Sequence, residues 1–138
     1  MRRFWTLLAL MFLTAATALA QDPVKVDPKH YKVEAENAQV RVLRIQYGPR
    51  EKSVMQHDHP DSVVVFLTDA KFKFTYPDGK SEESSGKAGE TRWHPGSKHL
   101  PENLGDKSFE AILVELKGKP APAKKAAPAK APAKKAGQ

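Results

Sequence analysis

The sequence between residues 31 and 116 is a series of short segments in which apolar and polar residues alternate, with turn-forming residues between them. The clearest segment is 71–76, where Phe72, Phe74 and Tyr76 share one face of an extended chain and a Pro-Asp-Gly turn follows. No part of this region has the sustained periodicity of a helix. Nine strands are expected, at residues 31–35, 39–47, 53–57, 62–67, 71–76, 81–85, 90–94, 98–103 and 108–116. Short strands at this spacing predict an all-β domain, either a sandwich or a barrel.

Three finer expectations concern single positions. Within residues 39–47 the apolar positions change parity midway, which predicts a β-bulge or a barrel bend in that strand. Pro101 predicts that the strand at 98–103 lies at a sheet edge, because proline lacks a backbone N–H. His30 precedes the first strand and is expected to be exposed.

Residues 1–20 have the layout of a secretory signal peptide. Arg2 and Arg3 give a positive start, a nearly uninterrupted apolar run follows, and Ala20 ends a small-residue cleavage site. The alternative is a membrane anchor, but the run is short for a bilayer span, which needs about 20 apolar residues. We therefore expect cleavage after Ala20, a periplasmic or secreted protein, and an N-terminal extension at 21–30.

The other end of the chain, residues 117–138, consists almost only of Lys, Ala and Pro and contains seven lysines and no acid. Its prolines block a continuous helix, and no large apolar side chain offsets the entropy of ordering. A disordered basic tail is predicted, with an anionic surface or polymer as its partner. The chain carries a net charge of +7, yet residues 21–116 hold more acidic than basic residues. Nucleic-acid binding by the domain therefore loses its main support and is not expected.

The sequence contains no cysteine, which excludes disulfides, thiolate catalysis and cysteine-ligated metals. It does contain His57 and His59, two positions apart in a segment expected to be extended. Alternate residues of a strand face the same side, so the two imidazoles would project together and form half of a metal site. The alternative is that both lie near a strand end and bond to solvent or backbone.

The run around these histidines resembles the first motif of the cupin superfamily, in which a glycine and a spacer precede His-x-His. Here Gly48, a longer spacer and the triplet His57-Asp58-His59 stand in that order. An apolar strand follows, as it does in small single-domain bacterial cupins.

A second stretch is similar to the second cupin motif, in which Gly, Pro-x-Gly, His and Asn follow one another at fixed spacing. Gly89, Pro95, Gly96, His99 and Asn103 match it, except that the residue between proline and glycine is missing. The resemblance implies a single jelly-roll-like β-barrel over residues 31–116. It also implies that a divalent metal ion, with Zn, Mn, Fe, Ni and Cu all open, is bound by His57, His59 and His99.

One part of the cupin pattern is missing. The usual glutamate ligand would fall at Val63, Val64 or Ser62, and none of these can supply a carboxylate. Three imidazoles with open positions still make a valid metal site, as in zinc enzymes with three histidines. Asp61 could substitute for the glutamate across the turn, and His94 could face the same pocket or have a structural role.

The resemblance leaves the function open between two classes. One is a metal-binding cupin with a small anionic or sugar-like ligand in the barrel, and, if it is an enzyme, of the oxygenase, isomerase or sugar-modifying type. The other is a non-catalytic binding or structural module with a degenerate metal site, tethered to anionic surfaces by its basic tail. Many cupins are homodimers, so a dimer is also expected from the resemblance.

Overall fold

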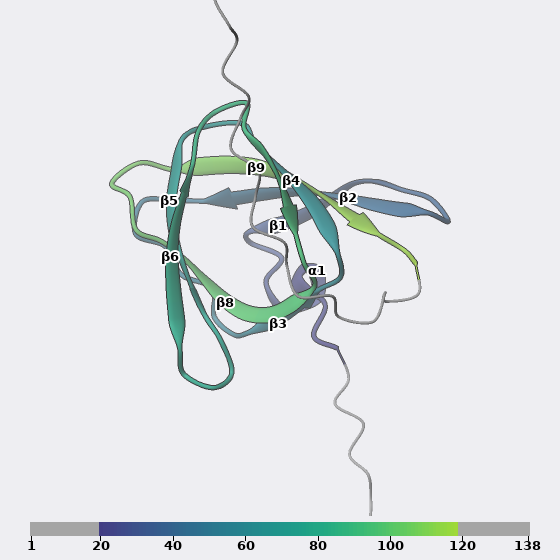
Figure 1. Cartoon of the computed structure of the whole chain (residues 1–138), viewed down its shortest axis with the longest axis horizontal. Coiled ribbons are helices and arrows are strands. Elements are labelled where there is room, and N and C mark those ends of the chain that lie inside the picture. Colours follow the sequence, from purple (N-terminus) through teal and green to yellow (C-terminus); the bar gives the residue numbers. More distant parts are fainter. Residues whose placement is uncertain (1–19, 119–138) are drawn as a thin grey trace, which may run out of the picture.

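The computed structural model describes residues 20–118, and these form two antiparallel β-sheets with one short helix (Figure 1). The predicted signal peptide and nearly all of the predicted tail lie outside the described residues. The helix α1 spans Pro23–Val26. The strands are β1 (Tyr31–Glu36), β2 (Val40–Tyr47), β3 (His57–His59), β4 (Ser62–Phe66), β5 (Ala70–Thr75), β6 (Ser81–Gly86), β7 (Thr91–His94), β8 (Ser97–Asn103) and β9 (Phe109–Leu116).

The two sheets enclose a barrel. One has the strand order β1-β2-β9-β4-β7 and the other the order β3-β8-β5-β6. In Figure 1, β2, β4 and β9 lie on one side of the barrel, β3 and β8 on the opposite side, and β5 and β6 close the ring between them. The last strand, β9, pairs with both β2 and β4, so the end of the domain lies at the centre of its sheet. The predicted all-β, jelly-roll-like barrel is confirmed.

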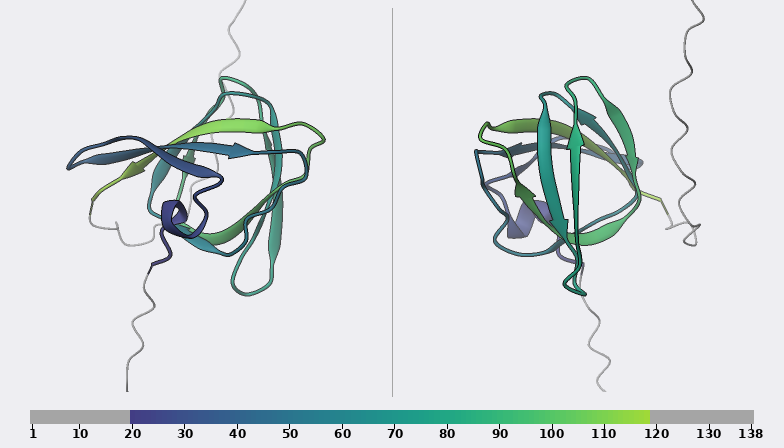
Figure 2. Two further views of the ribbon diagram at one scale, coloured as in Figure 1. Left: turned by 180° about the vertical axis from the view of Figure 1, so that it is seen from behind. Right: turned by 60° about the vertical axis from the view of Figure 1, so that its left-hand side comes forward.

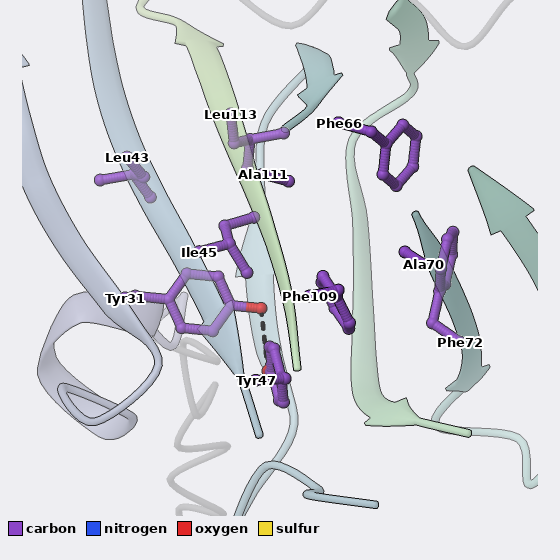
Figure 3. Close-up of a cluster of buried hydrophobic side chains, with 10 residues drawn as sticks. All are labelled: Tyr31, Leu43, Ile45, Tyr47, Phe66, Ala70, Phe72, Phe109, Ala111 and Leu113. Atoms are coloured by element: carbon purple, nitrogen blue, oxygen red, sulfur yellow. Dashed lines mark hydrogen bonds between the residues drawn. The ribbon is translucent and has the colours of Figure 1, made fainter. Parts of the chain in front are cut away.

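Alternation along the strands builds the core. On β2, Leu43, Ile45 and Tyr47 are buried inside the barrel, whereas the intervening Arg44 and Gln46 face outward. The inward side chains of the facing strands meet them (Figure 3). The buried cluster consists of Tyr31, Leu43, Ile45, Tyr47, Phe66, Ala70, Phe72, Phe109, Ala111 and Leu113.

The N-terminal extension is part of the folded unit. Asp22 caps α1 by accepting a hydrogen bond from the Val24 N–H at 3.0 Å, and Pro23 occupies the first turn, where a missing N–H costs nothing. Pro23 is buried, and α1 lies against β1 and β3, as the views in Figure 2 show. Within residues 20–118 no helix is long and apolar enough to cross a bilayer.

His30 is buried, so the prediction of an exposed side chain is wrong. It is 4% exposed, its ring stacks on Tyr47 with centroids 4.1 Å apart, and Nδ1 donates to Asp27 at 2.8 Å. The prediction failed because the turn after α1 folds His30 back under the barrel, a tertiary contact with no sequence motif.

Two strand details also differ from prediction. The irregular pairing lies in β1, between Val33 and Ala35, whereas β2 runs in continuous register with β9. Strand β8 is flanked by β3 and β5, so Pro101 is not at an edge. Proline lacks only a donor, and its carbonyl here accepts a hydrogen bond from the N–H of Ser53 at 3.0 Å.

The strand predicted at 53–57 begins at His57 instead and runs to His59. The preceding residues form a turn in which the Glu51 side chain accepts the Gly48 N–H at 2.7 Å. The shift places both histidines within the same strand.

Candidate metal centre

Two adjacent strands of one sheet bring three histidines together. His57 and His59 project from β3 on the same face, and His99 on β8 pairs directly with His57. Exposed fractions are 0% for His57, 5% for His59 and 2% for His99. One ring nitrogen from each lies within 4.8 Å of the others. The structure therefore brings together the three residues that the cupin resemblance implies.

Hydrogen bonds fix which nitrogen of two histidines faces the centre. His59 Nδ1 donates to Glu115 Oε1 at 2.8 Å, and His99 Nδ1 lies 2.8 Å from the hydroxyl of Ser97. Both rings therefore keep Nε2 for a metal ion. Such bonds to the second nitrogen orient metal-binding histidines and set their tautomer.

His57 carries an unsatisfied nitrogen. Its Nε2 lies 3.1 Å from the Tyr31 hydroxyl, while its buried Nδ1 has no hydrogen-bond partner among the described residues. Leaving a buried polar atom unpaired costs about 1–3 kcal/mol. Each of the three imidazoles offers a ring nitrogen within 4.8 Å of the other two, so the side chains present fit a metal ion.

Burial keeps several of these rings uncharged. It lowers the pKa of His57 to about 4 and that of His99 to about 2, and the neighbouring His59 adds to both shifts. Burial also lowers the pKa of His94 to about 4. Because only the neutral imidazole binds a metal, these rings are ready to coordinate at neutral pH.

Glu115 is a buried carboxylate behind His59. It is 2% exposed, and Arg41 Nε donates to its second oxygen at 2.6 Å. Burial opposes ionisation of Glu115, but the hydrogen bonds from His59 and Arg41 outweigh it and lower the pKa of Glu115. The result is an anionic group that orients His59 and increases its basicity as a metal ligand.

A chain of buried hydroxyls supports the other side of the centre. The Tyr47 oxygen lies 3.1 Å from the Tyr31 oxygen and 2.6 Å from that of Ser53, and Ser53 donates to Asp27. Asp27 also accepts from His30. The N-terminal extension thus anchors Tyr31, whose ring contacts the histidines.

The structure shows which positions of β4 face the barrel interior, where the missing glutamate of the cupin pattern would lie. Ser62 and Val64 point into the barrel and Val63 points away, because only alternate residues of β4 face inward. Ser62 is fully buried, and its hydroxyl donates to the Pro60 carbonyl at 2.6 Å. No acidic residue replaces the glutamate inside this strand.

Asp61 and His94 do not join the cluster of three. Asp61 accepts the Gly96 N–H at 2.7 Å and so holds the turn between β7 and β8. His94 faces the same cavity, with its ring centroid 5.3 Å from that of His99 and 6.4 Å from that of His59.

Sequence reasoning missed Glu115 and Tyr31. A signal for Glu115 exists, because it follows Phe109, Ala111 and Leu113 in the inward phase of β9, where an acid is out of place. No such signal marks Tyr31, which is one of several aromatic residues at strand positions.

Comparison with known proteins identifies the fold. A cupin domain from Bordetella pertussis matches with a TM-score of 0.58 and 28% identity, over 64% of this chain and 92% of that chain. A protein with a double-stranded β-helix domain from Klebsiella pneumoniae matches with a TM-score of 0.50 and 20% identity, over 66% and 78%. No protein-family model and no curated protein matches the sequence. Residues 20–118 therefore form a β-barrel with the cupin fold, with three buried histidines placed close enough to hold one metal ion.

Proposed function

We propose that this protein is an exported small cupin that binds a divalent metal ion through His57, His59 and His99. The observation that carries the proposal is the convergence of three buried imidazoles whose ring nitrogens lie within 4.8 Å of one another. The carboxylate of Glu115 behind His59 completes the arrangement seen around protein metal sites.

The ligand set narrows the choice of metal. Imidazole suits Zn, Cu, Fe and Ni, whereas Mn prefers carboxylate, carbonyl and water ligands. With Glu115 bonded to His59 and no acid at Ser62 or Val64, the inner ligands are imidazoles alone. Zn, Cu, Fe and Ni therefore fit this centre better than Mn.

A bound metal with open positions would act as a Lewis acid toward an oxygen atom of a ligand in the barrel. The chain itself supplies orientation through Glu115 and Ser97 and excludes water with its aromatic walls. Asp61 is committed to the backbone of Gly96, which leaves His94 as the titratable group best placed to exchange a proton with a ligand. These observations favour a metal-dependent binding site and assign no reaction to it.

Export is supported by the sequence of residues 1–20, and cleavage there would change one contact of the described chain. The N–H of Gln21 donates to the Asp58 carboxylate at 2.7 Å, and Asp58 donates its own N–H to the Gln21 carbonyl at 2.8 Å. Cleavage after Ala20 would turn the first of these bonds into an ion pair with the new α-amino group. Asp58 lies between two proposed ligands, so the mature terminus would help to hold β3.

A zinc competition titration tests the metal proposal. We expect His57→Ala and His99→Ala to weaken Zn²⁺ binding by more than about tenfold while the barrel stays folded. His94→Ala is the matched control, because His94 shares the cavity but not the cluster. Unchanged affinity in both of the first two variants would place the metal elsewhere or nowhere.

A further inference from the structure

The barrel encloses a cavity of about 450 Å³ beside the histidines. That volume is within the range of small-molecule sites, roughly 300–1,000 Å³. His59 and His99 form part of its wall, and the exposed Glu82, paired with the inward-facing Phe74, lines its rim. The cavity therefore connects the candidate metal centre with the surface.

The wall between the rim and the histidines is aromatic. Phe66 stacks on Phe72 with centroids 5.9 Å apart, and Phe72 lies 5.1 Å from Phe74 (Figure 3 shows the first pair). Phe74 stacks on the His99 ring at 4.0 Å. Flat aromatic surface therefore continues without a break to the imidazoles, a lining that favours ring-shaped apolar ligands.

Most polar groups of the wall are already paired. Arg92 Nε donates to Glu90 at 2.6 Å, and the same guanidinium bonds to Ser84 at 3.2 Å. The Tyr76 hydroxyl donates to Glu82 at 3.2 Å. A sugar would find few free partners for its hydroxyls, and an anion would meet an arginine that a carboxylate already neutralises. These pairings argue against the anionic or sugar-like ligand that the cupin resemblance led us to expect.

The exception is the histidine end of the cavity. Nε2 of His59 and Nε2 of His99 have no hydrogen-bond partner among the described residues. We propose that the cavity binds a flat aromatic molecule that carries oxygen donor atoms at one end, with its ring against Phe72 and Phe74 and its donors toward His59 and His99. The position of the aromatic ring is argued from the cavity alone, whereas the position of the oxygen donor atoms rests on the proposed metal function.

Calorimetric titration of the full chain with 2,3-dihydroxynaphthalene tests this inference, and glucose serves as the polar comparison. Val64→Phe fills the cavity from β4, and Val65→Phe adds the same side chain on the outward face of that strand. We expect the wild type and Val65→Phe to bind the naphthalene diol alike, Val64→Phe to bind at least about tenfold more weakly, and glucose not to bind. Equal affinity in all three proteins, or binding of glucose, would overturn the inference.

A rim variant and a comparison with and without zinc distinguish failure of the aromatic cavity from failure of the metal contact. Tyr76→Ala trims the aromatic wall near the rim without opening the core, so several-fold weaker binding is expected in a variant that folds. Each titration is repeated with Zn²⁺ and with EDTA. If zinc does not change the affinity but Val64→Phe still lowers it, the placement of the donor atoms beside a metal ion fails and the aromatic cavity stands, whereas the zinc competition titration decides the metal proposal itself. If neither variant lowers the affinity, the aromatic cavity fails whatever zinc does.

Discussion

Glu115 is a buried carboxylate behind His59 that we expect to strengthen the proposed metal site without being a ligand. Its carboxylate bonds to His59 at 2.8 Å and to Arg41 at 2.6 Å, so it fixes the ring that must present Nε2. We expect Glu115→Gln to weaken Zn²⁺ binding by about 10–100-fold, as for other carboxylates that support metal-bound histidines.

The matched control is Glu110→Gln, on the same strand but outside the barrel and bonded to Arg44. Zinc affinity measured by competition with a chelator should be unchanged in that variant. Equal losses in the two variants would mean that Glu115 acts only through general charge or stability.

The buried histidines also predict how the metal-free protein responds to acid. Burial lowers the pKa of His57, His94 and His99 below the usual value near 6.5. From pH 6.5 downward the unfolded chain takes up protons that the folded chain does not, so stability falls with pH. Each histidine contributes up to about 1.4 kcal/mol per pH unit in this window.

Denaturant unfolding with EDTA between pH 7.5 and 5 measures the effect above the range where ordinary carboxylates titrate. We expect the free energy of unfolding to decrease steadily below pH 6.5, and His94→Gln to reduce the slope. A flat profile across this range would show that the histidines are not held neutral by burial.

At the scale of an element, the β5–β6 hairpin depends on one glycine. A Cβ at Gly86 would lie 2.6 Å from three ring carbons of the buried Phe66, much closer than real contacts allow. Gly86→Ala must push that ring into the cavity, and overpacking of this kind costs about 1–3 kcal/mol.

Thermal unfolding measures this cost, with Ser85→Ala on the exposed face of the same strand as the control. Gly86→Ala is expected to lower the melting temperature and Ser85→Ala to leave it nearly unchanged. If both melt like the wild type, Phe66 can move away at no cost.

The strands and the helix also differ in how far the sequence could predict them. Alternation and turn residues located eight of the nine strands within residues 20–118, because a pleated strand leaves its period in the sequence, whereas β3 was predicted four residues too early. The helix α1 has a single turn, too short to leave a periodic signal, and the burial of His30 depends on where that turn packs. The pairing of β9 with β4 also leaves no signal in the local sequence of either strand. This pairing brings Glu115 opposite Ser62.

At the scale of the whole molecule, binding of the basic tail to an anionic surface remains a prediction, and lipid vesicles can test it. The folded unit reaches Lys117, whose N–H donates to the Gln39 carbonyl at 2.8 Å, so a chain ending at Gly118 keeps the barrel intact. Near an anionic membrane each lysine contributes about 1 kcal/mol, and salt screens the attraction. We expect the full chain to cosediment with phosphatidylserine vesicles at low salt and to be released as salt rises.

The shortened chain is expected to stay in solution at every salt concentration, because residues 20–118 retain no comparable cluster of lysines without acids. If both chains sediment equally with the vesicles, the barrel and not the tail binds the membrane. If neither sediments, the protein does not bind the membrane.

The proposed metal ion, held in the barrel by three histidines, can be sought directly in the purified protein. Elemental analysis of the full chain, expressed with export and purified without a histidine tag, tests this proposal most directly. We expect about one transition-metal ion per chain, lost in His99→Ala and kept in His94→Ala. Metal-free protein whose melting temperature does not rise when Zn²⁺, Fe²⁺, Ni²⁺ or Cu²⁺ is added would contradict this, because an ion that binds the folded state more tightly than the unfolded chain must stabilise the fold.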